Sequence, residues 1–600
     1  MRFPRLQEVA RYRDMTTVFG GYNHQISCSE GQFFDMKNMS SKYFPVLSPR
    51  DARGIVKKLT NPQGILDKED LWWIDNRILY RNGEKITLTG VSLTNDAPKT
   101  LAKMGAYIII MPDKVWCKAN DDDMALECGY MENIVAIDSG TEVKFSICEA
   151  SGKSIVWHDA EYYKTNEVKD GDYMMSVNAN GKSSLKVYSA STSIWMSVAS
   201  TYTQITANGI GIGFEKEDGV KIITDYIGES LDNIFVNTEE DGQHYSTNTY
   251  IVDKTDNSIT IPGIYSGTTE ALTNISLRVE RTVPELEFIT ECNNRLWGCS
   301  KDGHEIYCCK LGDVKNWNCF RGISTDSWAA TIGSDGKFTG AITYLGYPMF
   351  FKEDNLIKIA VSATGGHQIK ETRCRGVQGG SSRSLAILNE ILYYKSTTEV
   401  CAYNGSLPYS ISDDLGDVRY YDASAGAIGD KYYISMRDNN NKYSLFTYDS
   451  KNGIWCKEDN THASIFCVHK DDLYFIDAKD NTMKSVGGTL LYDVPEKKTE
   501  NNIDWYVESG TIGYSSPDNK YVGRINLRIT LEFGTNVEFF LQYDSCGEWE
   551  HKFSMSGTGT KSYSIPIVPK RCDHFKYKIM GKGGCKIHSV TKSIEEGSDG

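Results

Sequence analysis

The chain has 600 residues, of which 40% are hydrophobic and 24% charged, and its formal net charge is −14. This composition excludes a disordered chain, and the length leaves room for several domains with cores of their own. The acidic balance argues against a protein that grips phosphates, because such proteins carry basic patches, and here the one basic cluster stands at the amino end, at Arg2, Arg5, Arg11 and Arg13.

The amino end indicates neither export nor a membrane anchor. Residues 1–14 contain no apolar run of the kind that a signal peptide needs. The longest strongly apolar stretch, AYIIIM at 106–111, is far too short to cross a bilayer. We therefore expect a soluble chain that does not leave the cell by the usual secretory route and does not insert into membranes. Residues 1–53 contain strand-length pieces without a repeat, so we expect an extended arm that anchors on its own chain or on a neighbouring subunit.

A short pattern recurs along 54–122 and 285–495, in which a polar turn precedes a Leu or Ile and an aromatic residue that begin a strand. Five clear marks are 53, 43, 39 and 42 residues apart: Trp297, Phe350, Tyr393, Tyr432 and Tyr474. Looser copies stand at 69–88 and 104–121. Periods near 40–50 residues with about four short strands are typical of propeller blades. We expect an all-β chain whose 54–122 and 285–495 segments build a β-propeller of about six or seven blades.

Two further segments depart from the repeat. Residues 123–284 look like strands but carry no mark, so we expect one inserted β domain or two small ones, held in a loop of the propeller. Residues 496–600 alternate strongly between apolar and polar side chains, which predicts a C-terminal β-sandwich or jelly roll.

Several phrases resemble one family. They are GQFFDMKNMSSKYFPVLSPRDAR near the amino end, NRLWGCS with IYCCKLGDVKNWNCF, GYPMFFKEDNLIKI, GVQGGSSRSLAILNEILYYKSTTEVCAYNGSLPYSIS, SLFTYDSKNGIWCKED, and PIVPKRCDHFKYKIMGKGGCKIHSV towards the carboxyl end. Together they resemble the β-propeller tail proteins of tailed bacteriophages, including the tail nozzle or DNA-stabilisation proteins of short-tailed phages. The resemblance covers roughly 1–90 and 285–600, and 123–284 lies outside it.

The resemblance implies a structural protein of the virion, assembled in the host cytoplasm, and no enzyme. Such proteins form a ring at the lower end of the tail, most often a hexamer. The ring continues the channel for genome ejection, meets the adaptor or portal side, and holds fibres or receptor-binding proteins. Viral DNA would pass without specific binding, and an acidic surface suits a conduit that must not grip phosphates.

Two other functions stay open. The first is an adsorption module that binds host-surface glycans, which would be favoured by clustering of exposed aromatics in the insertion: Trp157, Tyr162, Tyr163, Trp195 and Tyr202. The second is a glycan-cleaving tail enzyme, which needs two carboxylates at a fixed separation. Turnover of a host polysaccharide, lost when one carboxylate is changed, would establish it.

Candidate catalytic and metal-binding residues are few, and we expect no catalytic, cofactor or metal site. Arg373, Arg375 and Arg383 do not repeat from blade to blade as a sialidase triad would, and turn or interface contacts explain them better. The acidic clusters read as solvated turns, with calcium as the alternative: Asp121–Asp123, Glu239–Asp241 and Asp413–Asp414. GIGIGF at 209–214 lacks the helix that a phosphate loop requires. Four isolated histidines are expected to be ordinary hydrogen-bonding residues: His24, His304, His462 and His574.

Residues 291–320 hold five cysteines and two tryptophans. No CxxC pair occurs among the sixteen cysteines of the chain, so zinc is disfavoured and free, buried thiols are expected. Titration of the unfolded protein should then find close to all sixteen free. Tryptophans at repeat positions are expected to fill blade cores rather than stack sugars: Trp72, Trp73, Trp297, Trp317 and Trp455.

Overall fold

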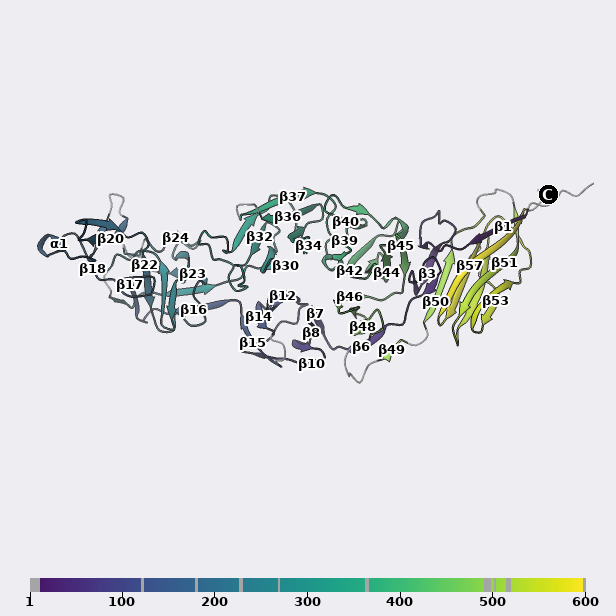
Figure 1. Cartoon of the computed structure of the whole chain (residues 1–600), viewed down its shortest axis with the longest axis horizontal. Helices are drawn as coiled ribbons and strands as arrows, with labels where there is room; N and C mark the ends of the chain where they lie inside the picture. The colour runs from purple at the N-terminus through teal and green to yellow at the C-terminus, as the bar shows by residue number, and fades with distance from the viewer. Residues whose placement is uncertain are drawn as a thin grey trace, which may run out of the picture.

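The chain is elongated, with three regions in line (Figure 1). The computed structural model describes residues 11–119, 124–177, 182–225, 230–231, 233–267, 270–361, 366–489, 498–500, 503–513 and 519–596. An inserted region occupies one end, a central region of small sheets the middle, and a terminal region of two larger sheets the other end. The described residues are almost wholly strand and turn, which confirms an all-β chain. Among them, no helix is long and apolar enough to cross a membrane.

Seven sheets of the described residues make up the central region, each with four antiparallel strands at its heart. The first two contain β7 (Pro62–Lys68), β8 (Asp70–Asp75), β9 (Ile78–Arg81) and β10 (Glu84–Lys85), then β11 (Thr87–Thr89), β12 (Thr100–Met104), β13 (Tyr107–Met111), β14 (Val115–Lys118) and β15 (Ala125–Tyr130). The next two contain β30 (Leu286–Cys292), β31 (Arg295–Ser300), β32 (Glu305–Cys308) and β33 (Trp328–Thr331), then β34 (Gly340–Tyr344), β35 (Tyr347–Phe351), β36 (Asn355–Val361) and β37 (His367–Arg373).

The remaining three sheets of this region follow in chain order. They contain β38 (Ala386–Leu388), β39 (Ile391–Lys395), β40 (Val400–Tyr403) and β41 (Tyr409–Ser410), then β42 (Tyr420–Ile428), β43 (Lys431–Asp438), β44 (Tyr443–Asp449) and β45 (Ile454–Lys457), then β46 (Ala463–His469), β47 (Asp472–Asp477), β48 (Thr482–Ser485), β6 (Gly54–Lys58) and β49 (Lys498–Thr499). The seventh sheet thus joins both ends of the region, because β6 pairs with β48 through Gly54 opposite Ser485.

Hydrophobic clusters lie between neighbouring central sheets. Trp72 and Ile108 belong to a cluster of the first two sheets, and Trp297 and Phe350 to one of the third and fourth. A further cluster contains Trp73 with Tyr474, so residues of the first sheet also pack against the seventh. The marks found in the sequence all lie on second strands: β31, β35, β39, β43 and β47. A large ring on that strand fills the space between two sheets, which is why it recurs.

Two-residue turns set the register of several of these hairpins. Asn76–Arg77 joins β8 to β9, Asn293–Asn294 joins β30 to β31, and Asn389–Glu390 joins β38 to β39. All six residues have positive φ between 49° and 64°. Paired positive φ angles are the mark of the turn whose twist matches that of antiparallel strands, and asparagine tolerates them better than most residues.

The inserted region begins where β15 ends, because β15 pairs with β14 and so extends the second central sheet to Tyr130. Its described residues form three sheets. The first contains β16 (Asn133–Ile137), β29 (Leu277–Arg281), β23 (Gly219–Thr224), β25 (Tyr245–Tyr250) and β24 (Asn237–Thr238), and the second contains β26 (Asp253–Thr255), β27 (Ser258–Pro262), β22 (Tyr202–Thr206), β17 (Val143–Cys148) and β28 (Ala271–Leu272). The third contains β18 (Trp157–His158), β19 (Tyr173–Val177), β20 (Ser183–Ser189) and β21 (Ile194–Ser197). The short helix α1 (Tyr162–Thr165) lies beside the third sheet at the far tip (Figure 1).

The terminal region combines both ends of the chain. One sheet contains β1 (Arg11–Thr16), β57 (Cys585–Glu596), β51 (Lys520–Leu531), β54 (Gly559–Ile565) and β55 (Arg571–Cys572). The other contains β2 (Gly21–Tyr22), β3 (Gln32–Lys37), β50 (Asp504–Ser509), β56 (Phe575–Lys582), β52 (Asn536–Tyr543) and β53 (Glu550–Ser556). The remaining pair is β4 (Met39–Ser40) with β5 (Ser48–Pro49). Residues 11–49 are therefore paired largely with carboxyl-terminal strands of their own chain.

Candidate functional site: two charged joints and an aromatic tip

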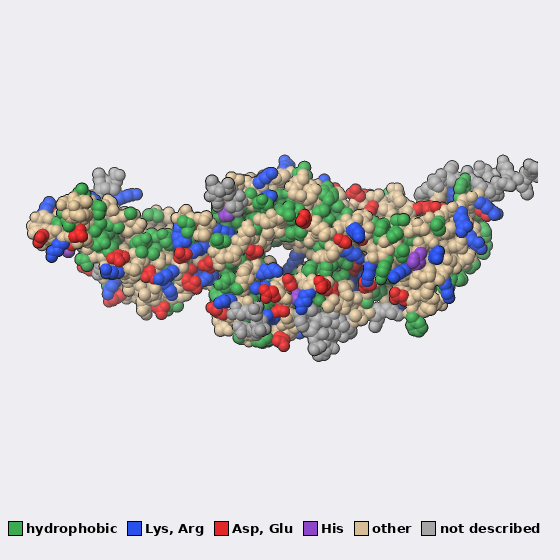
Figure 2. All heavy atoms as spheres, in the orientation of Figure 1, with side chains coloured by type: hydrophobic (Ala, Val, Ile, Leu, Met, Phe, Trp, Pro, Cys, Tyr) green, Lys and Arg blue, Asp and Glu red, His purple; other side chains and the backbone are tan. Residues whose placement is uncertain are grey.

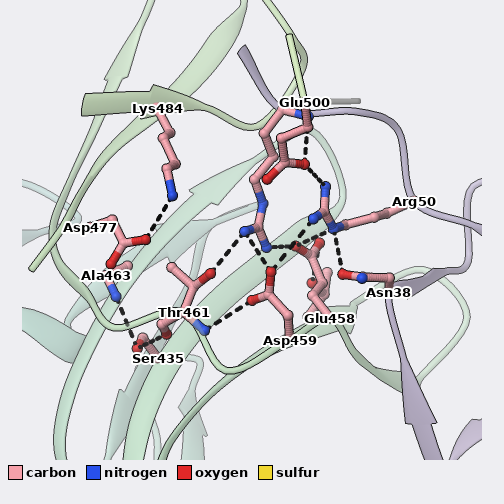
Figure 3. A network of polar contacts seen from close by, with 12 residues as sticks. Asn38, Arg50, Ser435, Glu458, Asp459, Thr461, Ala463, Asp477, Lys484 and Glu500 are labelled. Carbon is pink, nitrogen blue, oxygen red and sulfur yellow. Dashed lines mark hydrogen bonds and ion pairs between the residues drawn. The ribbon is translucent and has the colours of Figure 1, made fainter. Parts of the chain in front are cut away.

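Two arginines between β5 and β6 are buried against carboxylates from distant parts of the chain (Figure 3). The Arg53 side chain is 1% exposed, and its guanidinium lies 2.5 Å from Glu458 Oε2 and 2.8 Å from Asp459 Oδ2. Arg50 Nη1 lies 2.7 Å from Glu500 Oε2. We name these five residues the terminal joint, because they tie together the segment before β6, the loop before β46 and the segment after β49.

Asn38 connects this joint to the terminal region. Its side-chain oxygen accepts a hydrogen bond of 2.9 Å from Arg50 Nε, and its Nδ2 donates one of 2.8 Å to the carbonyl of Asp504 in β50. The backbone N–H of Asn38 also donates to the carbonyl of Glu458. The joint therefore stands where the chain crosses between the central and terminal regions, and it fixes both crossings.

The charges of the joint shift the pKa values of its members. Burial would raise the pKa of Asp459, but Arg53 and Arg50 outweigh it and hold that pKa well below its usual range. Burial is likewise outweighed for Glu500, whose pKa is lowered by the hydrogen bond and charge of Arg50. Burial acts on Arg53 too, yet the three carboxylates raise its pKa above the ordinary value. Asp459, Glu500 and Arg53 are therefore charged at neutral pH.

Three cavities of about 530, 240 and 670 Å³ border Arg50. The first is lined by the turn after β4, the β42–β43 turn and the β44–β45 turn, and it mixes cations with carboxylates, among them Lys431 and Asp449. Lys431 Nζ donates to Ser40 Oγ at 2.8 Å, while the carboxylate of Asp449 accepts from the N–H groups of its own turn. Lys431 and Asp449 therefore have partners within the chain, as expected for a crevice between packed segments.

A second buried ion pair stands where the inserted region meets the central region. Asp218 and Arg281 form it, with side chains 1% and 5% exposed. Asn316, from the loop between β32 and β33, donates to Asp218 Oδ1 at 3.0 Å and accepts from the N–H of Gly219 at 2.8 Å. Arg281 Nε also donates to the carbonyl of Met131 at 3.1 Å. We name Asp218, Arg281 and Asn316 the insertion joint.

Ion pairs surround the insertion joint. Glu217 lies 2.5 Å from Lys310 Nζ and 3.0 Å from Arg321 Nη1, and hydrogen bonds from both lower its pKa. Glu215 pairs with Lys315 at 2.8 Å, and its pKa is lowered by that hydrogen bond. Acidic residues of the insertion thus face basic residues of the central region. Gly219 permits the close approach, because a Cβ there would lie 2.6 Å from the backbone of Asn318.

The cysteine-rich stretch 291–320 is explained by this arrangement. Its first part forms β31 and β32, and its last part lies in the loop whose Asn316 bonds Asp218 and Gly219 of the inserted region. Its cysteines are buried: Cys292, Cys299, Cys308, Cys309 and Cys319. Among the described residues, no group of three or more His, Cys, Asp or Glu side chains is placed to hold a metal ion. The expected core role of the tryptophans is confirmed, since each is at most 3% exposed: Trp72, Trp73, Trp297, Trp317 and Trp455.

Aromatic side chains form a continuous row at the tip of the inserted region. His158 stacks on Tyr162 with ring centroids 3.7 Å apart, Tyr163 lies 5.0 Å from Trp195, and Trp195 lies 5.3 Å from Tyr188. Tyr162 meets Tyr163 edge-on at 5.2 Å. Figure 2 shows hydrophobic side chains gathered on this end of the molecule. Val156 and Val177 are exposed in the same segment, as are Ile194 and Met196, which flank Trp195 in β21 and therefore point to the opposite face of the sheet.

The row includes three of the five aromatics that the sequence singled out, and two others that it missed. Trp157 instead packs against the small core beneath the tip sheet, and Tyr202 lies on β22, opposite Pro262. His158 and Tyr188 join the row through local pairing, since Tyr188 stands directly opposite Trp195 in neighbouring strands. Strand alternation in β20 is the signal that would have placed Tyr188 on this face.

The arginines considered as a catalytic set have separate partners. Arg375 pairs with Glu399, Arg383 donates to the carbonyl of Ser464 at 3.2 Å, and Arg373 ends β37 opposite Asn355. Contacts in turns and between sheets therefore explain Arg375 and Arg383. The histidines have ordinary partners as expected: His24 bonds the carbonyl of Phe34, His304 donates its backbone N–H to Asp302, His462 stacks on Tyr443, and His574 bonds Asp573 and Ser545.

The acidic clusters differ from one another. Asp121–Asp123 lie outside the described residues. Asp241 accepts N–H groups of its own turn, and these bonds with that of His244 lower its pKa to about 2. Asp413 and Asp414 accept through their carbonyls from Gln25 and His24. GIGIGF forms the turns between β22 and β23.

No family model and no curated protein matches the chain. Among solved structures, the structure of apo AztD from Citrobacter koseri is similar over 68% of this chain and 94% of that chain, with 11% sequence identity and a TM-score of 0.21. At that identity and score, the similarity says nothing about what this chain binds or does.

Proposed function

We propose that this chain is a structural subunit of a bacteriophage tail, of the nozzle or hub class, and that it assembles into a ring of six copies. The observation that carries the proposal is the pair of joints, which hold three β regions in line as one elongated unit. A subunit that bears load between neighbours needs fixed angles between its parts. Here the buried ion pairs lie between regions and hold those angles, which suits a structural role better than a catalytic one.

The proposal includes a β-propeller of seven blades in the central region. Its support is the order of contacts between end strands of successive sheets, in which β7 lies beside β12, β12 beside β30, β30 beside β34, β42 beside both β38 and β46, and β46 beside β7. The short helical turn at 382–384 contacts both β34 and β42, and so connects the sheet of β34 to the sheets that follow it. Figure 2 shows this region hollowed at its middle. In such a ring, β6 would close the last blade with a strand from the start of the chain.

The proposed partners follow from the three regions. The terminal region offers β1, an edge strand with Tyr12 and Met15 more than half exposed, and the inserted region offers its tip. One side of the ring would meet the adaptor or portal, and the other would hold fibres or receptor-binding proteins. The formal charge of −14 supports a channel wall through which DNA passes without specific binding. The subunit would be made in the host cytoplasm and act in the virion.

Labelling of virions tests this proposal. Antibodies against the purified chain should bind at the lower end of the tail, and particles from a phage with the gene disrupted should lack that density and fail to retain or deliver their genome. Virions that carry no copy of the chain would refute the proposal.

A second candidate function has its own observation, the aromatic row at the tip. Aromatic faces stack on sugar rings, so the inserted region would bind a host-surface glycan and the chain would act in adsorption. The tip can be removed cleanly, because Cys148 and Tyr202 face each other across β17 and β22. Replacing residues 150–200 by a two-residue turn should abolish binding on a glycan array and leave the rest of the chain folded. Equal binding by both proteins would refute the tip as the site.

A further inference from the structure

We propose that Cys117 and Cys128 form an oxidation site, at which a cross-strand disulfide staples β14 to β15. The proposal does not depend on the proposed tail function. The two residues are direct partners in the antiparallel register of these strands, and their Sγ atoms lie 2.6 Å apart.

The backbone positions suit a disulfide. Residues directly opposite in an antiparallel pair have Cα atoms about 4.5–5.5 Å apart, which lies inside the range of about 4.4–6.8 Å seen for disulfide-bonded cysteines. Both side chains of a facing pair point to the same side of the sheet. Bond formation therefore needs only a small adjustment of the two side chains.

This pairing distinguishes the two residues from the other cysteines. All sixteen cysteines lie in the described part of the chain, and within it no other two stand opposite each other in neighbouring strands. Cys308 and Cys309 are adjacent in sequence but belong to different hydrophobic clusters, because successive residues point to opposite sides. Thiol proximity along the chain therefore does not predict the pair, whereas strand register does.

The environment assigns a role to each sulfur. Cys117 is fully buried and Cys128 is half-buried, so an oxidant reaches Cys128 first. The hydrogen bond with Cys117 lowers the pKa of Cys128, which favours the reactive thiolate. With hydrogen peroxide as oxidant, Cys128 attacks one peroxide oxygen and releases hydroxide, which gives a sulfenic acid. That hydroxide takes the proton that Cys128 lost on becoming a thiolate, which gives the first water. The sulfur of Cys117 then attacks Cys128 Sγ, and the leaving hydroxide takes the proton of Cys117, which gives the second water.

The consequence lies at the root of the inserted region. β15 ends at Tyr130, and the inserted region begins at Asn133 in β16. The bond would close the loop between the two strands and hold β15 against unpairing. Oxidation would thus stiffen the strand from which the insertion departs.

Peptide mapping of the full-length protein tests the site. The reduced protein is treated under native conditions with hydrogen peroxide, its remaining thiols are alkylated, and it is digested with trypsin without reduction. Cleavage after Lys114, Lys118 and Lys144 yields peptides 115–118 and 119–144, which contain one cysteine each. The expected result is these two peptides joined, with a mass two hydrogens below their sum, and hydrogen exchange in β15 slowed at least fivefold after oxidation.

The controls separate oxidation at this pair from general damage. Cys546 is exposed, so its oxidation or alkylation shows that the reagents worked. C128A should abolish the joined peptides, and C308A should leave them unchanged. Loss of both separate peptides without a joined product, or a joined product with any other cysteine in preference, would overturn the proposal. Modification of Cys546 while peptides 115–118 and 119–144 stay separate would overturn it as well.

Discussion

Replacing Arg53 by methionine should weaken the terminal joint severely. The change keeps an unbranched apolar stem, but it removes the guanidinium that lies over the ring of Phe475 and pairs with Glu458, whose side chain is 4% exposed. Removing one partner of a buried ion pair costs about 3–5 kcal/mol, because the other charge is left without compensation. Arg50 remains 3.8 Å from Glu458 and 3.5 Å from Asp459, so we expect the lower end of that range.

Hydrogen exchange resolved by segment measures this effect, since a chain of several regions does not unfold in one step. A loss of about 3 kcal/mol corresponds to exchange about 150-fold faster, and it should be confined to β6 and residues 458–461. Arg77→Met is the matched control, because its ion pair with Asp96 is exposed at both ends and its loss should leave exchange unchanged. The double variant R53M/E458L should recover much of the loss, since it removes the stranded charge. Unchanged exchange in R53M, or no recovery in the double variant, would refute the reasoning.

Three further predictions follow from the same joints and core. The pKa values of Asp459 and Glu500 are lowered in the folded chain, so their stabilisation is present above about pH 4, the unfolded value, and is lost as the pH falls further. Exchange in β6, corrected for its intrinsic pH dependence, should therefore stay constant down to about pH 4 and accelerate below it, and less so in E500Q. Asp218→Asn should leave the charge of Arg281 buried without its partner and lower the free energy of unfolding by about 3–5 kcal/mol. The expected readout is faster proteolysis at residues 282–285, and unchanged cleavage would contradict the role of the insertion joint. Trp455→Ala should lower the free energy of unfolding by about 3–5 kcal/mol, because it removes a buried ring and its hydrogen bond of 2.6 Å to the carbonyl of Ile411. Hydrogen exchange in β45 that does not accelerate would contradict this.

The strand content of the fold was readable from the sequence, because its signals are local. Aromatic residues repeating every 40–50 positions fall on second strands, where each fills the space between two sheets, as Trp297 and Tyr474 do. Turns with asparagine at positive φ, such as Asn293–Asn294, punctuate the strands. Each aromatic residue and each asparagine turn marks its own hairpin within a few residues, so a single sequence is enough to recognise it.

The joints could not be predicted in the same way. Arg53 and Glu458 are 405 residues apart, and Asn316 is 98 residues from Asp218. Arginines and acids are common on any surface, and nothing local tells a buried pair from an exposed one. Only the pairing of the sheets brings these residues together. The facing cysteines were hidden for a related reason, since their partnership depends on the register of β14 and β15 rather than on spacing.

The most direct test of the central claim is the mass of the purified chain in solution, combined with images of the particles by negative stain. The account predicts a ring of six elongated subunits around a central hole, with a channel wall that is not basic when resolved further. A monomer that binds host glycans through its aromatic tip would contradict the ring and favour the adsorption function. A ring whose channel is lined by lysine and arginine would contradict the proposed conduit for DNA.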